Sequence, residues 1–157
     1  MRGRISLELP GDPWTVSLCR RVLRSWLEDL SVDETRLADI ELVLSEAAGN
    51  VVRHAYARRG SAYRVIVTFF TDRLRLEVTD QGVGFLRASI PHPDEQQLGG
   101  RGLWLIEQLA DVTTVSTTPG GGCCLKAEFC LPCLFALAAA ADDAEPRVEG
   151  IGCGRVA

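Results

Sequence analysis

Hydrophobic and polar residues first alternate along the chain and then repeat with the period of a helix. Residues 4–9 place three apolar side chains on one face, which predicts a half-buried strand. Residues 13–30 then carry apolar residues at helical spacing, so a helix should follow the strand. We expect Asp12 to cap this helix and Pro13 to occupy its first position, where each residue type is favoured.

The second helical pattern is the longest in the chain. Ser31 and Glu34 have the spacing of a capping box, which predicts that the helix starts there. Gly60 is a good C-terminal stop, because glycine accepts the backbone conformation that ends a helix.

Three polar residues of that long helix lie one turn apart on the same face. Glu46, Asn50 and His54 follow each other at intervals of four residues, beside the apolar stripe. A carboxylate, an amide and an imidazole therefore stand in a line. Taken singly, each is more typical of a solvated helix face than of a functional site.

The rest of the chain combines short strands, loops and one helix. Thr71 and Asp72 predict a hairpin turn, and the long polar segment 86–98 is typical of a lid over a site. The order of elements predicts an α+β two-layer sandwich, with a mostly antiparallel sheet covered by helices on one face. The remaining predicted elements cover residues 63–70, 74–80, 102–110, 112–118 and 125–131.

Two glycine-rich segments follow the polar helix. The first reads Asp-Gln-Gly-Val-Gly over residues 80–84, directly after a predicted strand. The second reads Gly-Gly-Arg-Gly-Leu over residues 99–103 and opens the next helix. Together with Glu46-x-x-x-Asn50, their order resembles the GHKL ATPase superfamily of gyrase, chaperone ATPases, histidine kinases and MutL. The finer resemblance, over roughly residues 4–131, is to the stand-alone anti-sigma-factor serine kinases of bacteria.

The resemblance assigns roles to the polar line of the helix. Glu46 matches the family's general base, which accepts a proton from an incoming hydroxyl or water. Asn50 matches the family's Mg²⁺ ligand, and its amide oxygen is a hard donor that suits this metal. His54 is interpreted as a supporting or packing residue rather than a direct participant.

The resemblance also assigns the nucleotide contacts. The aspartate of the first glycine segment matches the family's contact to the adenine amino group, and its glycines let the backbone close on the nucleotide. Bare N–H groups at the start of the following helix are suited to phosphates. The nucleotide-binding residues predicted in this way are Asn50, Asp80, Gly82, Gly84, Gly100, Arg101, Gly102 and Leu103.

One position departs from the family pattern. Members usually carry a threonine near the final strand that helps to form the adenine site. Here the segment 122–125 reads Gly-Cys-Cys-Leu, so Cys123 and Cys124 stand where threonine is expected. A thiol is a weaker hydrogen-bonding group than a hydroxyl.

Composition narrows the class of protein. A chain of 157 residues with 46% hydrophobic and 24% charged residues is typical of one globular domain. Its net charge of −4 argues against direct nucleic-acid binding, and no apolar run is long enough for a membrane span.

A P-loop is excluded because no G-x-x-x-x-G-K-[ST] segment is present. We expect the ATPase domain at residues 1–133 and a poorly ordered tail at residues 134–157.

The cysteines and the arginines of the first helix each allow two interpretations. The spacing of the six cysteines lacks a paired C-x-x-C pattern, so buried thiols on a strand are favoured over a zinc site. Arg20, Arg21 and Arg24 lie off the apolar stripe. They fit a solvated face better than a docking patch for an acidic partner.

These observations together predict a cytoplasmic, ATP- and Mg²⁺-dependent serine/threonine kinase resembling anti-sigma factors. By the resemblance, it would sequester a sigma factor and phosphorylate a STAS-type anti-anti-sigma partner, and a homodimer is compatible with the sequence. One alternative is a non-catalytic, ATP-dependent binding module of the same fold. The other is the detached ATPase half of a histidine kinase, which the lack of a preceding helical hairpin with a phospho-accepting histidine disfavours.

Overall fold

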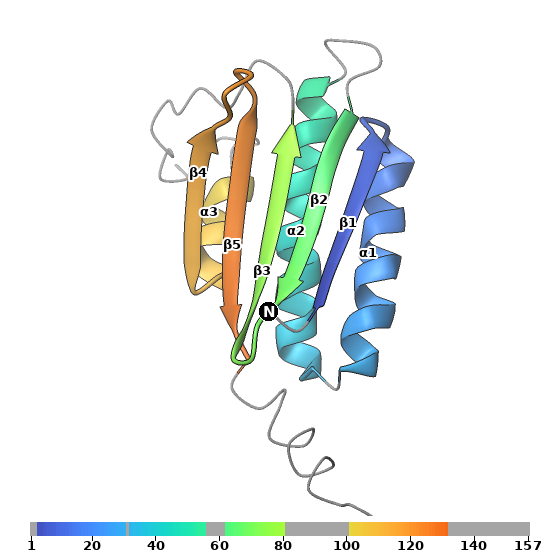
Figure 1. Cartoon of the computed structure of the whole chain (residues 1–157), viewed down its shortest axis with the longest axis vertical. Coiled ribbons are helices and arrows are strands. Elements are labelled where there is room, and N and C mark those ends of the chain that lie inside the picture. The colour runs from blue at the N-terminus through green and yellow to red at the C-terminus, as the bar shows by residue number, and fades with distance from the viewer. Residues whose placement is uncertain (1–2, 31, 56–61, 81–100, 132–157) are drawn as a thin grey trace, which may run out of the picture.

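The computed structural model describes residues 3–30, 32–55, 62–80 and 101–131, which form five strands and three helices. The sheet order is β1-β2-β3-β5-β4, and every neighbouring pair is antiparallel. The three helices cover one face of this sheet (Figure 1). The elements are β1 Gly3–Pro10, α1 Pro13–Asp29, α2 Glu34–Ala55, β2 Ala62–Phe69, β3 Arg73–Asp80, α3 Arg101–Leu109, β4 Val112–Thr117 and β5 Cys123–Cys130.

This architecture confirms the predicted α+β two-layer sandwich. The predicted hairpin at Thr71 and Asp72 joins β2 to β3, where the Phe70 amide donates to the Arg73 carbonyl at 2.8 Å. The predicted lid and tail, residues 86–98 and 134–157, lie outside the described residues, as does the end of the long helix near Gly60. No helix in the described ranges is both long enough and apolar enough to span a bilayer.

The core lies between the sheet and the helices, and α2 contributes most of its helical residues. Alternate residues of β3 and β5 are buried, and the strand register sets Leu76 opposite Ala127 and Val78 opposite Leu125. Because side chains alternate across a strand, these residues all face the helical layer. The α2 residues of this core are Leu37, Ile40, Val43, Leu44, Ala47, Ala48, Val51 and Val52.

The start of α1 differs from the prediction in one detail. Asp12 precedes the helix and Pro13 opens it, but the Asp12 side chain makes no capping hydrogen bond. The Thr15 hydroxyl lies within 2.6 Å of the Asp12 carbonyl oxygen and donates to it, and it also contacts the Tyr63 hydroxyl at 2.9 Å. The buried threonine therefore fastens this turn, and the Asp12 side chain stays exposed.

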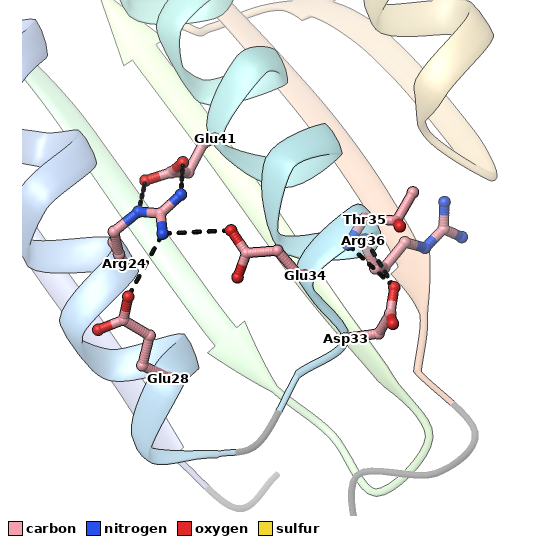
Figure 2. A network of polar contacts seen from close by, with 7 residues as sticks. All are labelled: Arg24, Glu28, Asp33, Glu34, Thr35, Arg36 and Glu41. Atoms are coloured by element: carbon pink, nitrogen blue, oxygen red, sulfur yellow. Dashed lines mark hydrogen bonds and ion pairs between the residues drawn. The ribbon is translucent and has the colours of Figure 1, made fainter.

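The start of α2 also corrects the prediction. The helix begins at Glu34, and its cap is Asp33 rather than Ser31, which lies outside the described residues. Asp33 Oδ1 accepts hydrogen bonds from the amides of Thr35 and Arg36 at 3.0 and 3.2 Å (Figure 2). An aspartate at this position satisfies free N–H groups and places a negative charge at the positive end of the helix dipole.

Arg24 bridges α1 and α2, so its interpretation as part of a solvated face is wrong. Its Nε and Nη2 donate to the two carboxylate oxygens of Glu41 at 2.9 and 2.7 Å. Its Nη1 lies 3.3 Å from Glu28 and 3.4 Å from Glu34 (Figure 2). The hydrogen bonds to Glu41 raise the pKa of Arg24. A planar, bidentate arginine–carboxylate pair of this kind fixes the relative position of the two helices.

A second polar contact joins the start of α2 to the end of α3. Arg36 Nη1 donates to the Leu109 carbonyl at 3.2 Å, and Nη2 pairs with the Asp111 carboxylate. The same carboxylate accepts a hydrogen bond from the Cys130 amide at 2.6 Å. The guanidinium also lies 5.5 Å from the centre of the Phe129 ring. The C-terminal end of α3 is thereby fixed to α2 and to β5.

The contact between Arg36 and Asp111 predicts that the Asp111→Asn substitution lowers the free energy of unfolding by an amount that depends on pH. Burial raises the pKa of Asp111, but the hydrogen bond from Cys130 and the charge of Arg36 outweigh it, and the pKa lies below its ordinary 3.8. A lowered pKa means that the carboxylate stabilises the fold above the unfolded-state pKa and loses this effect as the pH falls through the folded-state pKa.

The Asp111 side chain is 39% exposed, so solvent screening limits the expected loss near pH 7 to about 1 kcal/mol. Urea unfolding of wild type and Asp111→Asn should show this difference at neutral pH and a shrinking difference below about pH 4. A difference that stays constant with pH would contradict the role of the charge.

Candidate functional site

The first turn of α3 lies against the polar face of α2 at the predicted site. Glu46 and Asn50, one turn apart on α2, both face Gly102 of α3. A Cβ atom at Gly102 would lie 2.7 Å from Glu46 Oε2 and 3.4 Å from Asn50 Nδ2. A glycine at this position therefore lets the two helices approach this closely. The structure thus brings together three of the predicted site residues.

Packing on both sides holds this contact in place. On α2, Ala47 and Ala48 are buried in the core beside the polar face. On α3, Ile106 is fully buried, so the helix cannot rotate without losing that contact. Asn50 is itself largely buried, whereas the Glu46 side chain is 31% exposed.

Arg53 belongs to the same group of residues, although the sequence did not single it out. Its Nη2 donates to Asn50 Oδ1 and lies 3.8 Å from Glu46 Oε2. The signal in the sequence was its spacing, three residues after Asn50 and seven after Glu46, which puts all three on one helix face.

Asp80 ends β3 and contacts the start of β5. Its Oδ1 accepts a hydrogen bond from the Cys123 amide at 3.4 Å. The predicted adenine contact therefore lies at the start of the strand that carries Cys123 and Cys124, where the resemblance led us to expect a threonine. Figure 1 shows the end of β3, the start of β5 and the C-terminal half of α2 at the same end of the molecule.

The structure describes only some of the other predicted site residues. Arg101 is exposed at the first position of α3, and the Leu103 side chain packs against the core. Gly82, Gly84 and Gly100 lie outside the described residues. His54 is helical, but its side chain also lies outside the description.

The prediction that the cysteines are buried holds for some of them and not for others. Cys123 is buried on β5, but Cys130 at the other end of the strand is exposed, which contradicts the prediction for that residue. The register explains the difference: Cys130 is on the face of the sheet away from the helices, at an alternate position to buried Phe129. In the described ranges, no three histidine, cysteine or acidic residues are close enough together to hold a metal ion by themselves.

The residues at the α2–α3 contact fit a magnesium-bound nucleotide. Asn50 and Glu46 offer an amide oxygen and a carboxylate, the hard oxygen donors that Mg²⁺ takes. The bare Gly102 keeps the space beside them free of a side chain that would fill it. The start of α3 adds backbone N–H groups, which favour anions.

Comparison with known proteins identifies the family of this chain. Residues 9–127 match the histidine kinase-like ATPase domain, and the chain belongs to that family. It is 30% identical to the serine-protein kinase RsbW of Staphylococcus epidermidis, over 74% of this chain and 80% of the relative. It is 32% identical to RsbW of Bacillus licheniformis, over 74% of this chain and 80% of the relative. The anti-sigma F factor of Pasteuria penetrans is 30% identical, over 77% of this chain and 86% of that one.

Solved structures share the fold. The chain resembles a crystal structure of the SiaB–SiaC complex from Pseudomonas aeruginosa with a TM-score of 0.65 and 15% identity, over 80% of this chain and 88% of the other. A structure of the RsbU and RsbW domains of a Mycobacterium tuberculosis protein gives a TM-score of 0.61 at 22% identity, over 81% and 32%. Both resemblances predicted from the motifs, to the ATPase superfamily and to the anti-sigma-factor kinases, are confirmed.

Gly102→Ala should damage the site and leave the fold intact. The added methyl group would displace the flexible end of Glu46 and crowd the Asn50 amide. The helix itself should tolerate alanine, which has the higher helix propensity. We expect the melting temperature to change little and the affinity for ATP with Mg²⁺ to fall about tenfold, which corresponds to about 1.4 kcal/mol of strain.

Gly120→Ala is the matched control, because a Cβ atom there meets no other atom within 4 Å. Calorimetric titration and thermal melting of both variants check the prediction. Wild-type ATP affinity in Gly102→Ala would show that the close approach of α3 is unrelated to nucleotide binding.

Proposed function

We propose that this protein is an ATP-dependent anti-sigma-factor serine/threonine kinase. The observation that carries the proposal is the contact at Gly102, which gathers Glu46 and Asn50 at the start of α3. The relatives named as serine-protein kinases and as an anti-sigma factor support the same conclusion, since each aligns with most of this chain.

Glu46 acts as the general base of the transfer. It accepts the proton of a serine or threonine hydroxyl, whose oxygen forms a bond to the γ-phosphorus of ATP. The bond from that phosphorus to the β–γ bridging oxygen breaks, and ADP leaves with the electron pair. The partly exposed carboxylate suits this role, because a macromolecular hydroxyl must reach it.

Asn50 and the start of α3 hold the phosphates. The Asn50 amide oxygen would be the protein ligand for Mg²⁺. The bound metal would supply positive charge that offsets the negative charge developing during transfer. Backbone N–H groups from Gly100 to Leu103 and the exposed Arg101 side chain receive the phosphate oxygens.

Asp80 selects adenine over other nucleobases. Its carboxylate accepts a hydrogen bond from the adenine amino group, as Gly82 and Gly84 let the backbone close over the nucleotide. The hydrogen bond from the Cys123 amide holds the Asp80 side chain at the end of the sheet. Cys123 and Cys124 take the place of the threonine and leave the adenine site with weaker side-chain donors.

The partners in this proposal are a sigma factor and a STAS-type anti-anti-sigma protein, in the cytoplasm. The chain binds the first and phosphorylates the second. Arg20 and Arg21 are exposed on α1, and neither forms an ion pair within the described ranges. Residues 1–133 form the kinase domain in this proposal, with residues 134–157 as a tail outside it.

Substitutions at Glu46 and Asn50 should separate chemistry from binding. Glu46→Ala should keep ATP affinity nearly intact, while phosphate transfer falls by about 10²–10⁴, the usual contribution of a positioned base. Asn50→Ala should lose Mg²⁺-dependent ATP binding itself, because the metal ties the phosphates to α2. Equilibrium ATP binding and label transfer from γ-labelled ATP to a co-purified partner measure the two effects.

The same assay distinguishes this proposal from a non-catalytic binding module of the same fold. A wild-type chain that binds ATP and its partner but transfers no label would establish the binding module. Label transfer at the wild-type rate by Glu46→Ala would place the base at another residue.

A further inference from the structure

Arg53 folds back along α2 onto the residues of the candidate site. Its guanidinium extends over Gly49, where an added Cβ atom would meet Arg53 Nη1 at 3.4 Å. This is an ordinary contact distance, so the guanidinium lies directly beside the helix at Gly49. Although 63% exposed, the side chain turns back to Asn50 and Glu46.

Both contacts are made by one nitrogen. Arg53 Nη2 donates to Asn50 Oδ1 and lies 3.8 Å from Glu46 Oε2. The oxygen that Arg53 holds is the one that the proposed function assigns to Mg²⁺. A guanidinium this close would repel a divalent cation at the same oxygen, and it also occupies the side of Asn50 that faces Glu46.

We propose that Arg53 holds the Asn50 amide oxygen in the metal-free protein and must release it before Mg²⁺ binds there. This inference rests on the proposed function, because it takes Asn50 as the metal ligand. Arg53 is then a positioning residue. It orients the Asn50 amide and balances the charge of Glu46 until the nucleotide and its metal arrive, and it sets the Mg²⁺ concentration at which ATP binds.

The Mg²⁺ dependence of ATP binding tests this competition without relying on catalysis. The Mg²⁺ concentration that half-saturates binding of a fluorescent ATP analogue is measured for wild type, Arg53→Met and Arg53→Lys. Removal of the competing charge in Arg53→Met should lower this concentration about two- to fivefold, the scale of an exposed ion pair. Arg53→Lys should stay near wild type, since one ammonium can make both contacts that Nη2 makes.

Arg4→Met is the matched control, because Arg4 is an exposed arginine on β1, at the opposite edge of the sheet from α3. It removes the same charge and should leave the half-saturating concentration unchanged. An equal shift in Arg4→Met, or an unchanged or higher concentration in Arg53→Met, overturns the inference. If the wild type binds the analogue with Mg²⁺ and transfers phosphate while Arg53→Met is unchanged, this inference alone fails. If the wild type shows no Mg²⁺-dependent binding, the proposed function fails with it.

Discussion

The close approach of α3 to the polar face of α2 is the contact on which the site depends. Gly102 permits it, because any larger residue would meet Glu46 and Asn50. The approach does two things at once. It places a helix start, whose first N–H groups have no partner within the helix, beside a carboxylate and an amide, and it leaves no side chain of Gly102 between them. In the proposed function, neither helix alone would supply donors for phosphates together with ligands for a metal.

Other contacts in the fold fix the positions of these two helices relative to each other. At the far end of α3, Arg36 and Asp111 fix the helix to α2 and β5. On the other side of α2, the two-pronged contact between Arg24 and Glu41 fixes the helix to α1. The helices pack against the buried, apolar face of the sheet. Cross-strand ion pairs such as Arg75 with Glu128, at 2.7 Å, lie on the other face.

Patterns within one element were sufficient to predict much of this structure. Alternation along β3 and β5 identified which side chains are buried, and helical spacing put Glu46 and Asn50 on one face. The order of the glycine segments indicated the ATPase family. The predictions of buried faces and of the shared helix face succeed because each depends on residues close together in the sequence, where backbone geometry decides which side chains lie on the same face.

Contacts between distant elements were not predictable in the same way. The role of Arg24 depends on Glu41, which α2 brings beside α1, and the role of Arg36 depends on Asp111, 75 residues later. The capping error had a different cause, because Asp33 and Ser31 are both acceptable caps and local sequence could not choose between them. Arg53 was within reach of the helical-spacing argument, but spacing does not show whether an exposed arginine turns to solvent or back to its helix.

A crystal structure with Mg²⁺ and a non-hydrolysable ATP analogue would show whether Asn50 and the start of α3 hold the metal and the phosphates. We expect the phosphates at the start of α3 and the Asn50 amide oxygen about 2.1 Å from the metal, the usual magnesium–oxygen distance. We also expect that Arg53 has left that oxygen. A nucleotide bound away from the α2–α3 contact, or a metal held without Asn50, would contradict this assignment.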